Sequence, residues 1–534
     1  MNRILLLFIG VALLLQAAAA DVLTPPKIID ASDPAYPSIE TRKLQMVSSM
    51  AVSPKGRLWA VWYAGPTSGE DRNNYVVVAT SGDDGQTWEE RLVIDPDGSG
   101  PLRAFDPEIW VDPDGRLRVF WGQAVSHGKN AQTWQMTSAV ADAGDPVWDP
   151  PRHVAPGVMM CKPIIRSNGE WLFPISDWEA RTGGDPDAAS AAVYISVDQG
   201  ETFTLRGAAL VPLEHRNYDE HMVVERKHGD LWMLVRTKYG IGESVSTDGG
   251  RTWPVVSPSS IKHPTARFFI TRLNSSNLLL VKHGPLDQRI GRSHLQAVIS
   301  KDDGRTWGGG LLLDGRSGIS YPDGQQTADG TIYITYDHSR RKERAIHMAA
   351  FTEEDAAAGE AVSGRVRLRE LISAPEPLPV NPEEPYEPGK FDLNSNDDGV
   401  PLNQTAAARI EPDDGGTFDT LEIGAEIWSD RKYVFSVIPD ELKGKRFIRS
   451  SIELSRGAVV KAGFVYVIAR DKSIAGDLLN KGFEKTDIPQ FIPFTVKDSY
   501  KIEDACSVYQ KQVKPGDRVD YKTWGITVFS TSPE

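Results

Sequence analysis

The stretch Ser300-Lys-Asp-Asp-Gly-Arg-Thr-Trp307 has the pattern S-x-D-x-G-x-T-[W/F], which occurs in four copies along the chain. The other copies are SGDDGQTW at Ser81–Trp88, SVDQGETF at Ser196–Phe203 and STDGGRTW at Ser246–Trp253. Each copy has the chemistry of a hairpin turn, because the Asp carboxylate accepts backbone N–H groups, Gly supplies a positive φ, and the aromatic ring returns to pack between sheets. We therefore interpret these Asp residues as turn residues and not as catalysts.

The spacing of the copies predicts the fold. Successive copies start 246 − 196 = 50 and 300 − 246 = 54 residues apart, and the first gap, 196 − 81 = 115, is about twice as long. Units of about 50 residues with four short strands are typical of propeller blades. A unit without the pattern fits the long gap, with strands expected at Phe105–Trp110 and Leu117–Trp121, and a sixth unit begins at Tyr321. We predict a six-bladed β-propeller at residues 21–374, closed by a terminal strand from either Lys27–Asp30 or Val366–Ile372.

The composition changes after the sixth unit. Six prolines between Pro375 and Pro388 predict a stiff linker over residues 375–390. Alternating apolar segments follow at Tyr433–Ile438, Phe464–Ala469 and Gly525–Phe529. We therefore predict an all-β chain in which the propeller is followed by a β-sandwich-like accessory domain at residues 391–534.

Composition and charge narrow the function classes. Of the 534 residues, 40% are hydrophobic, which argues against a disordered chain. The chain has 59 basic and 73 acidic residues, which gives a formal net charge of −14. An acidic chain without Lys/Arg runs is a poor nucleic-acid binder. Residues 1–20 have the features of a cleaved signal peptide and no later segment is apolar enough to span a membrane, so we expect a secreted or periplasmic protein. The two cysteines, Cys161 and Cys506, exclude a disulfide scaffold.

The repeated pattern, the six units and the export signal together resemble the sialidase (neuraminidase) superfamily, whose repeats are called Asp-boxes or BNR repeats. The resemblance covers residues from about 40 to 350 and implies an exo-glycoside hydrolase that acts on a terminal sialic acid. It also implies a glycan substrate as the partner, and no metal or organic cofactor. The sequence does not indicate an oligomeric state or a role for the second domain.

The resemblance assigns three catalytic roles. Ser320-Tyr321-Pro-Asp323 is similar to the family's nucleophile segment, and Tyr218-Asp-Glu220 to the segment that holds its base. Asp71, ten residues before the first box, matches the family's proton donor. A Tyr phenol suits a substrate whose anomeric carbon bears a carboxylate, because an anionic nucleophile would be repelled there. Glu220 would take the phenol proton, and Asp71 would protonate the leaving oxygen and then activate water.

Substrate-binding residues are assigned in the same way. Arg236 and Arg292 match two of the three family arginines that bind the substrate carboxylate, but Met46-Val47-Ser48 stands where the family has its first arginine. Arg267 opens the fifth inner strand and is the expected replacement. Charged or polar residues also open other inner strands and are expected to line the same subsite. They are Asp106, Glu108, Lys162 and His221, together with Arg267.

The missing arginine leaves two other functions open. The first is a propeller hydrolase or lyase that acts on another acidic polysaccharide. The second is a carbohydrate-binding protein without catalytic activity, in which the second domain binds the sugar. The substrate sugar and its linkage are not indicated by the sequence.

Overall fold

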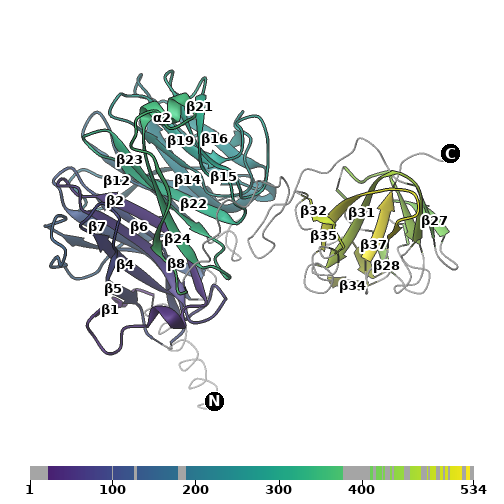
Figure 1. Ribbon diagram of the computed structural model, residues 1–534, viewed down its shortest axis with the longest axis horizontal. Coiled ribbons are helices and arrows are strands. Elements are labelled where there is room, and N and C mark those ends of the chain that lie inside the picture. Colours follow the sequence, from purple (N-terminus) through teal and green to yellow (C-terminus); the bar gives the residue numbers. More distant parts are fainter. Residues whose placement is uncertain are drawn as a thin grey trace, which may run out of the picture. The chain divides into compact units, whose positions relative to one another are not determined.

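The computed structural model describes residues 22–98, 100–125, 129–178 and 188–376, and shorter stretches between residues 409 and 529. The chain divides into two compact units, Met1–Asn396 and Asp397–Glu534 (Figure 1). The predicted signal peptide at residues 1–20 and most of the predicted linker at residues 375–390 lie outside the described residues. No helix in the described parts of the chain is long and apolar enough to cross a membrane.

Six antiparallel sheets form the first unit, and each contains four consecutive strands. In chain order the sheets comprise β2 (Leu44–Val52), β3 (Leu58–Gly65), β4 (Tyr75–Ser81) and β5 (Glu89–Asp95); β6 (Leu102–Val111), β7 (Leu117–Val125), β8 (Lys129–Ser138) and β9 (Arg152–Pro156); β10 (Ile164–Ile165), β11 (Trp171–Ser176), β12 (Ala191–Ser196) and β13 (Thr204–Ala209); β14 (Arg216–Glu225), β15 (Leu231–Thr237), β16 (Gly240–Ser246) and β17 (Ser257–Pro258); β18 (Phe269–Arg272), β19 (Leu278–His283), β20 (Leu295–Ser300) and β21 (Gly308–Asp314); and β22 (Ile319–Gln326), β23 (Thr331–His338), β24 (Ala345–Thr352) and β25 (Arg367–Ser373). The first strands pack side by side around a common axis, with β2 against both β6 and β22, and β18 against both β14 and β22. This arrangement confirms the predicted six-bladed propeller.

The ring closes differently from the prediction. β1 (Lys27–Asp30) pairs with β5 as a fifth strand of the first sheet, and β25 pairs with β24 in the sixth, so neither terminal strand bridges the first and last sheets. Side chains join these sheets instead: the Ser49 Oγ in β2 lies 2.8 Å from Asp323 Oδ1 in β22, and the Val52 N–H donates to Gln325 Oε1 at 3.0 Å. Contacts between β2 and β22 therefore join the first and last sheets without an exchanged strand.

The four Asp-boxes form turns between the third and fourth strands of their sheets, as predicted. In the first box the Asp83 carboxylate accepts the backbone N–H and the hydroxyl of Thr87, at 2.9 and 2.6 Å, and Ser81 Oγ accepts the N–H of Gly85. The other three boxes repeat these contacts. Gly85 has φ +85°, which explains the need for glycine at this position.

Short helices connect some of these strands. They are η1 (Ile39–Thr41), η3 (Leu213–His215) and α2 (Glu353–Ala358). Helix α2 begins with a capping box. The Asp355 N–H donates to Thr352 Oγ1, and the Thr352 N–H donates to Asp355 Oδ2.

The second unit is a layered all-β domain, which agrees with the sandwich-like prediction. Its six-stranded sheet has the order β27 (Thr417–Thr420), β29 (Arg446–Arg449), β37 (Gly525–Phe529), β31 (Gly463–Arg470), β35 (Cys506–Val513) and β32 (Glu484–Lys485). Two three-stranded sheets comprise β26 (Arg409–Pro412), β30 (Gly457–Lys461) and β36 (Arg518–Val519), and β28 (Tyr433–Phe435), β33 (Phe494–Val496) and β34 (Ser499–Ile502). Alternate residues of β31 enter different cores, since Val465 packs with Val459 and Tyr466 with Phe435. Both faces of the larger sheet are therefore buried.

Candidate functional site

The first strands of four propeller sheets carry a bulge near their start. The strand pairing shifts between Met46 and Ser49 in β2, Phe105 and Glu108 in β6, Arg216 and His221 in β14, and Ser320 and Asp323 in β22. The bulged residues have positive φ angles; they are Val47 (53°), Asp106 (46°), Tyr218 (63°), Asp219 (52°) and Tyr321 (54°). Such angles are rare for β-branched and aromatic residues, and bulges redirect side chains next to functional sites. The bulges therefore mark one end of the propeller axis as the candidate site.

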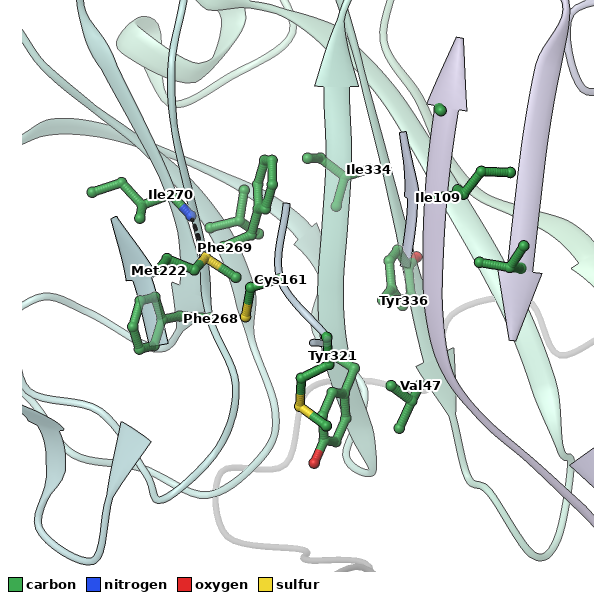
Figure 2. Packing of buried hydrophobic residues seen from close by; sticks show 14 of the residues in the cluster. Val47, Ile109, Cys161, Met222, Phe268, Phe269, Ile270, Tyr321, Ile334 and Tyr336 are labelled. Atoms are coloured by element: carbon green, nitrogen blue, oxygen red, sulfur yellow. Dashed lines mark hydrogen bonds between the residues drawn. The ribbon is translucent and has the colours of Figure 1, made fainter. Parts of the chain in front are cut away.

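Tyr321, Glu220 and Arg236 meet at this end of the axis. The Tyr321 hydroxyl donates to Glu220 Oε1 at 3.0 Å, and Arg236 Nη1 donates to the same carboxylate oxygen at 2.6 Å and to the Tyr321 oxygen at 2.9 Å. Figure 2 shows the Tyr321 ring at the edge of the buried cluster, with its oxygen directed away from Ile334 and Phe269. Burial, followed by the charge of Glu220, raises the pKa of Tyr321 above its usual value, against the opposing effect of Arg236. The phenol is thus protonated at neutral pH and hydrogen-bonded to a base.

Two further guanidinium groups contact the Tyr321 ring. The guanidinium carbon of Arg292 lies 5.8 Å from the ring centroid and that of Arg340 lies 4.7 Å from it. Arg292 also donates to Ser320 Oγ at 3.0 Å, and Arg340 Nε donates to Asp337 Oδ1 at 3.1 Å. Together with Arg236 they place three positive charges around one phenol. We call Tyr321, Glu220, Arg236, Arg292 and Arg340 the Tyr321 cluster.

Arg340 is the residue that sequence reasoning missed. Its carbonyl accepts the N–H of Gln45 at 3.3 Å, so it lies beside the start of β2, where Met46-Val47-Ser48 replaces the expected first-sheet arginine. It follows β23, the second strand of its sheet, whereas Arg236 belongs to β15, the second strand of the fourth sheet. A search for arginines at the ends of second strands, in addition to the starts of first strands, would have found it.

Asp71 in the first sheet and Asp106 in the second, both predicted site residues, have contrasting environments. Asp71 lies in a loop whose Asn74 carbonyl accepts the N–H of Ala104 in β6. Its carboxylate accepts hydrogen bonds from Thr67 Oγ1 at 2.6 Å and from the backbone and side chain of Asn73, both at 2.8 Å. Burial acts to raise the pKa of Asp71, but these hydrogen bonds outweigh it and leave that pKa below its usual value.

Asp106, by contrast, is 6% exposed. Burial raises the pKa of Asp106 well above its usual value, and the charges of Glu220 and Glu70 act in the same direction. Arg103 opposes them, with its guanidinium stacked 4.2 Å from the centroid of Phe105. The pKa of Asp106 is therefore shifted upward and that of Asp71 downward by their different surroundings.

Lys162 and Arg267 lie in a buried ion cluster on the axis instead of contacting Tyr321. Lys162 Nζ donates to Glu108 Oε1 at 2.6 Å and to Asp323 Oδ1 at 2.7 Å, while Arg267 Nη2 donates to Asp323 Oδ2 at 2.7 Å. Lys162 Nζ also reaches the carbonyl of Ile109 at 2.7 Å, so its protons are occupied. In place of the expected substrate contacts, these two residues form ion pairs with Glu108 and Asp323.

His221 also lies away from the Tyr321 cluster. It follows Glu220 in β14, and successive strand residues face opposite sides. Its Nε2 lies 2.8 Å from the carbonyl of Ala192, and burial lowers its pKa to about 4. The expectation that His221 lines a substrate subsite is therefore replaced by a neutral, buried histidine between two sheets.

The described residues show no group of three or more His, Cys, Asp or Glu side chains that could hold a metal ion. Cys161 and Cys506 are both buried free thiols.

Comparisons with known proteins address the family. Residues 56–334 match the BNR repeat-like domain, which is more than half of the chain. A search of curated proteins finds no significant match. This family match and the fold confirm the predicted sialidase-like BNR-repeat superfamily.

Three solved structures illustrate the likeness in fold. A protein of unknown function from Dyadobacter fermentans is 18% identical, with a TM-score of 0.46, and the match covers 59% of this chain and 96% of that one. The Hadza microbial sialidase Hz136 is 21% identical, with a TM-score of 0.48 and coverage of 59% and 66%. The NanB sialidase from Streptococcus pneumoniae is 13% identical, with a TM-score of 0.48 and coverage of 62% and 71%. At these identities the likeness concerns the fold alone.

Proposed function

Because the chain belongs to the family of BNR repeat-like domains, we propose that it is an exported, retaining exo-glycoside hydrolase that removes a terminal sialic acid, or a related acidic sugar, from glycans. The nucleophile in this proposal is Tyr321 and its base is Glu220. Arg236, Arg292 and Arg340 bind the acidic group of the substrate. The proposed reaction uses no metal ion or organic cofactor.

The observation that carries the proposal is the hydrogen-bonded triangle of Tyr321, Glu220 and Arg236. A phenol is a weak nucleophile while it is protonated, and the raised pKa of Tyr321 means that it needs a base. Glu220 Oε1, 3.0 Å from the phenolic oxygen, is within reach of that proton. Arg236 contacts both oxygens and stabilises the negative charge wherever the proton resides.

The charge around Tyr321 supports an acidic substrate. Three guanidinium groups surround the phenol, and two of them contact carboxylates, Arg236 with Glu220 at 2.6 Å and Arg340 with Asp337 at 3.1 Å. A substrate carboxylate would add a further anionic partner to this group of three cations. Such a carboxylate on the anomeric carbon would repel an ionised Asp or Glu nucleophile, whereas a neutral phenol paired with a base avoids that repulsion.

The experiment that tests this function is hydrolysis of a fluorogenic sialoside by the wild type, by Tyr321→Phe and by Tyr333→Phe. Tyr333 is a matched control, since its hydroxyl donates to Asp84 in the first Asp-box at 2.7 Å, outside the Tyr321 cluster. We expect Tyr321→Phe to lose on the order of 10³-fold in kcat, because the nucleophile is gone, and Tyr333→Phe to retain activity. NMR of the first product should show retention of the anomeric configuration.

Three results would contradict the proposal. Wild-type activity that survives Tyr321→Phe would remove the nucleophile from the mechanism. A product with unsaturated-uronate absorbance would indicate a lyase. Glycan binding without turnover of any acidic glycoside would indicate a carbohydrate-binding protein.

A further inference from the structure

We propose that His263 and His283 form a buried hydrogen-bonded pair that positions Tyr321 for its attack on the anomeric carbon. His283 acts on Tyr321 through the backbone of Ile319, so both histidines are positioning residues that do not touch the substrate. This inference rests on the proposed function and adds two residues to the site that it uses.

The backbone at Tyr321 needs support from its neighbours. Tyr321 has a φ angle of 54°, in the left-handed region that aromatic residues rarely adopt. The pairing of β22 with β23 shifts between Ser320 and Asp323, so the ladder does not hold Tyr321 itself. A strained conformation of this kind persists only where surrounding contacts fix it. The contacts that fix the residues before Tyr321 therefore bear on the direction of its phenol.

The fifth sheet and its loops supply these contacts. Both polar backbone groups of Ile319, two residues before Tyr321, are bonded to this part of the chain. The Ile319 N–H donates to the Arg292 carbonyl at 3.2 Å, and the Ile319 carbonyl lies 2.8 Å from Nε2 of His283, the last residue of β19. The Arg292 guanidinium donates to Ser320 Oγ at 3.0 Å. The segment that leads into the bulge is thus held by one backbone carbonyl and two side chains.

The contact between the two histidines determines which nitrogen of His283 carries a proton. A carbonyl only accepts hydrogen bonds, so His283 Nε2 must be the N–H that donates to Ile319. Both rings are 0% exposed, and burial lowers the pKa of His283 to about 3, so its ring is neutral at neutral pH and its Nδ1 is an acceptor. His263 Nε2 lies 3.2 Å from that Nδ1 and is the matching donor. His263 thus stabilises the one tautomer of His283 that can hold Ile319.

The backbone is also fixed on both sides of the pair. Lys282 is fully buried, and its Nζ donates to three successive backbone carbonyls, those of residues 283–285, at 2.6, 2.7 and 2.7 Å. On the other side, the carbonyl of Thr265, two residues after His263, accepts a hydrogen bond from Arg292 Nη2 at 3.2 Å. The pair therefore links two segments that have anchors of their own, which makes it a rigid support for Ile319.

The experiment compares His283→Asn with His283→Gln. The asparagine amide can still meet His263 near the position of Nδ1, but it is too short to reach the Ile319 carbonyl, whereas the glutamine amide can reach it. We expect His283→Asn to lose about 100-fold in kcat on a fluorogenic sialoside, because a small misplacement of a reacting atom has an effect of this size. KM should stay near the wild-type value, since Arg292 keeps the contacts of its guanidinium. His283→Gln should restore kcat to within about 10-fold of the wild type.

The matched control is His347→Asn. His347 in β24 is also a buried histidine, 2% exposed, and its ring stacks on Tyr336 outside the Tyr321 cluster. This variant should have a lower Tm but a kcat near the wild-type value, measured at a temperature at which every variant is folded. The control separates the positioning of Tyr321 from the general cost of altering a buried histidine.

A second measurement tests the tautomers in the wild-type protein. Long-range ¹H–¹⁵N NMR spectra of the histidine side chains at neutral pH should show His263 and His283 as neutral rings that carry their proton on Nε2. An imidazolium at His283, or a proton on its Nδ1, would overturn the inference.

The kinetic outcomes separate this inference from the proposed function. An active wild type with an unchanged kcat in His283→Asn, or with equal losses in His283→Asn and His283→Gln, would overturn the inference and leave the proposed function standing. A loss confined to KM would also overturn it, because the effect would then lie in binding and not in the position of Tyr321. A wild type that hydrolyses no acidic glycoside would overturn both.

Discussion

Removing the positive charge of Arg340 should weaken binding of an acidic sugar and leave binding of its uncharged ester unchanged. Arg340 lies 4.7 Å from the Tyr321 ring centroid, and its Nη2 is buried without an acceptor among the described residues. Its Nε contacts Asp337, which is fully buried, so Arg340→Gln alone would leave an unpaired carboxylate in the core. The informative variant is therefore the double change Arg340→Gln with Asp337→Asn.

The expected magnitude follows from the one contact that is lost. A hydrogen bond to a charged group contributes about 1.5–3 kcal/mol, and 1.36 kcal/mol corresponds to a tenfold change, so affinity for the acid should fall by about 10- to 150-fold. The methyl ester of the same sugar has no carboxylate charge, so it cannot form this charged hydrogen bond with Arg340. Its affinity should change by less than about 3-fold, which is within the scatter of single neutral contacts.

The assay is isothermal titration calorimetry of a methyl sialoside and its methyl ester. The matched control is the double change Arg365→Gln with Asp329→Asn, because this exposed pair at 3.2 Å lies outside the Tyr321 cluster. We expect the ratio of the affinity for the acid to the affinity for the ester to fall in the Arg340 variant and to stay unchanged in the control. A preference that persists in both variants would refute the assignment of Arg340 to the substrate carboxylate.

Three further predictions concern the base, the axis and the Asp-boxes. Glu220→Gln should lower kcat by about 10²- to 10⁴-fold, since an amide cannot accept the phenol proton; steady-state kinetics that match the wild type would contradict this. Lys162→Met should lower the free energy of unfolding by about 3–5 kcal/mol, because two buried carboxylates would lose one of the two cations that they share; an unchanged urea midpoint would argue against it. Hydrogen bonds from the Thr306 hydroxyl and N–H lower the pKa of Asp302 to about 2, so its contribution to stability is present above its unfolded value of about 4 and is lost as the pH falls through 2. The difference in Tm between the wild type and Asp302→Asn should therefore shrink from pH 5 to pH 2, and a constant difference would contradict the predicted role.

The propeller was predictable because its signals are local. In each Asp-box the bonds among Ser, Asp, Gly and Thr fall within eight residues, so the turn is encoded where it forms. Closure of the ring was not predictable in the same way. It depends on contacts such as Ser49 with Asp323, which are 274 residues apart and have no local pattern.

The candidate site was predictable where a residue's place in a strand determines its direction. Glu220 and Arg236 were expected together from two adjacent antiparallel strands, and the structure joins them at 2.6 Å. His221 and Lys162 were assigned from their place at the opening of strands. Strand alternation turns His221 to the opposite side from Glu220, and Lys162 contacts Glu108 and Asp323 instead. Arg340 lies just after the end of β23, a second strand, whereas most candidates were sought at the starts of first strands.

The most direct test of the central claim is to trap the covalent intermediate. A sialic acid analogue with fluorine beside the anomeric carbon and a fluoride leaving group slows hydrolysis of the glycosyl-enzyme more than its formation, so the adduct accumulates. Digestion and mass spectrometry should then find the added sugar on the peptide that contains Tyr321, and no adduct in Tyr321→Phe. A label on Glu220 or on an aspartate, or inactivation without any covalent adduct, would contradict the account.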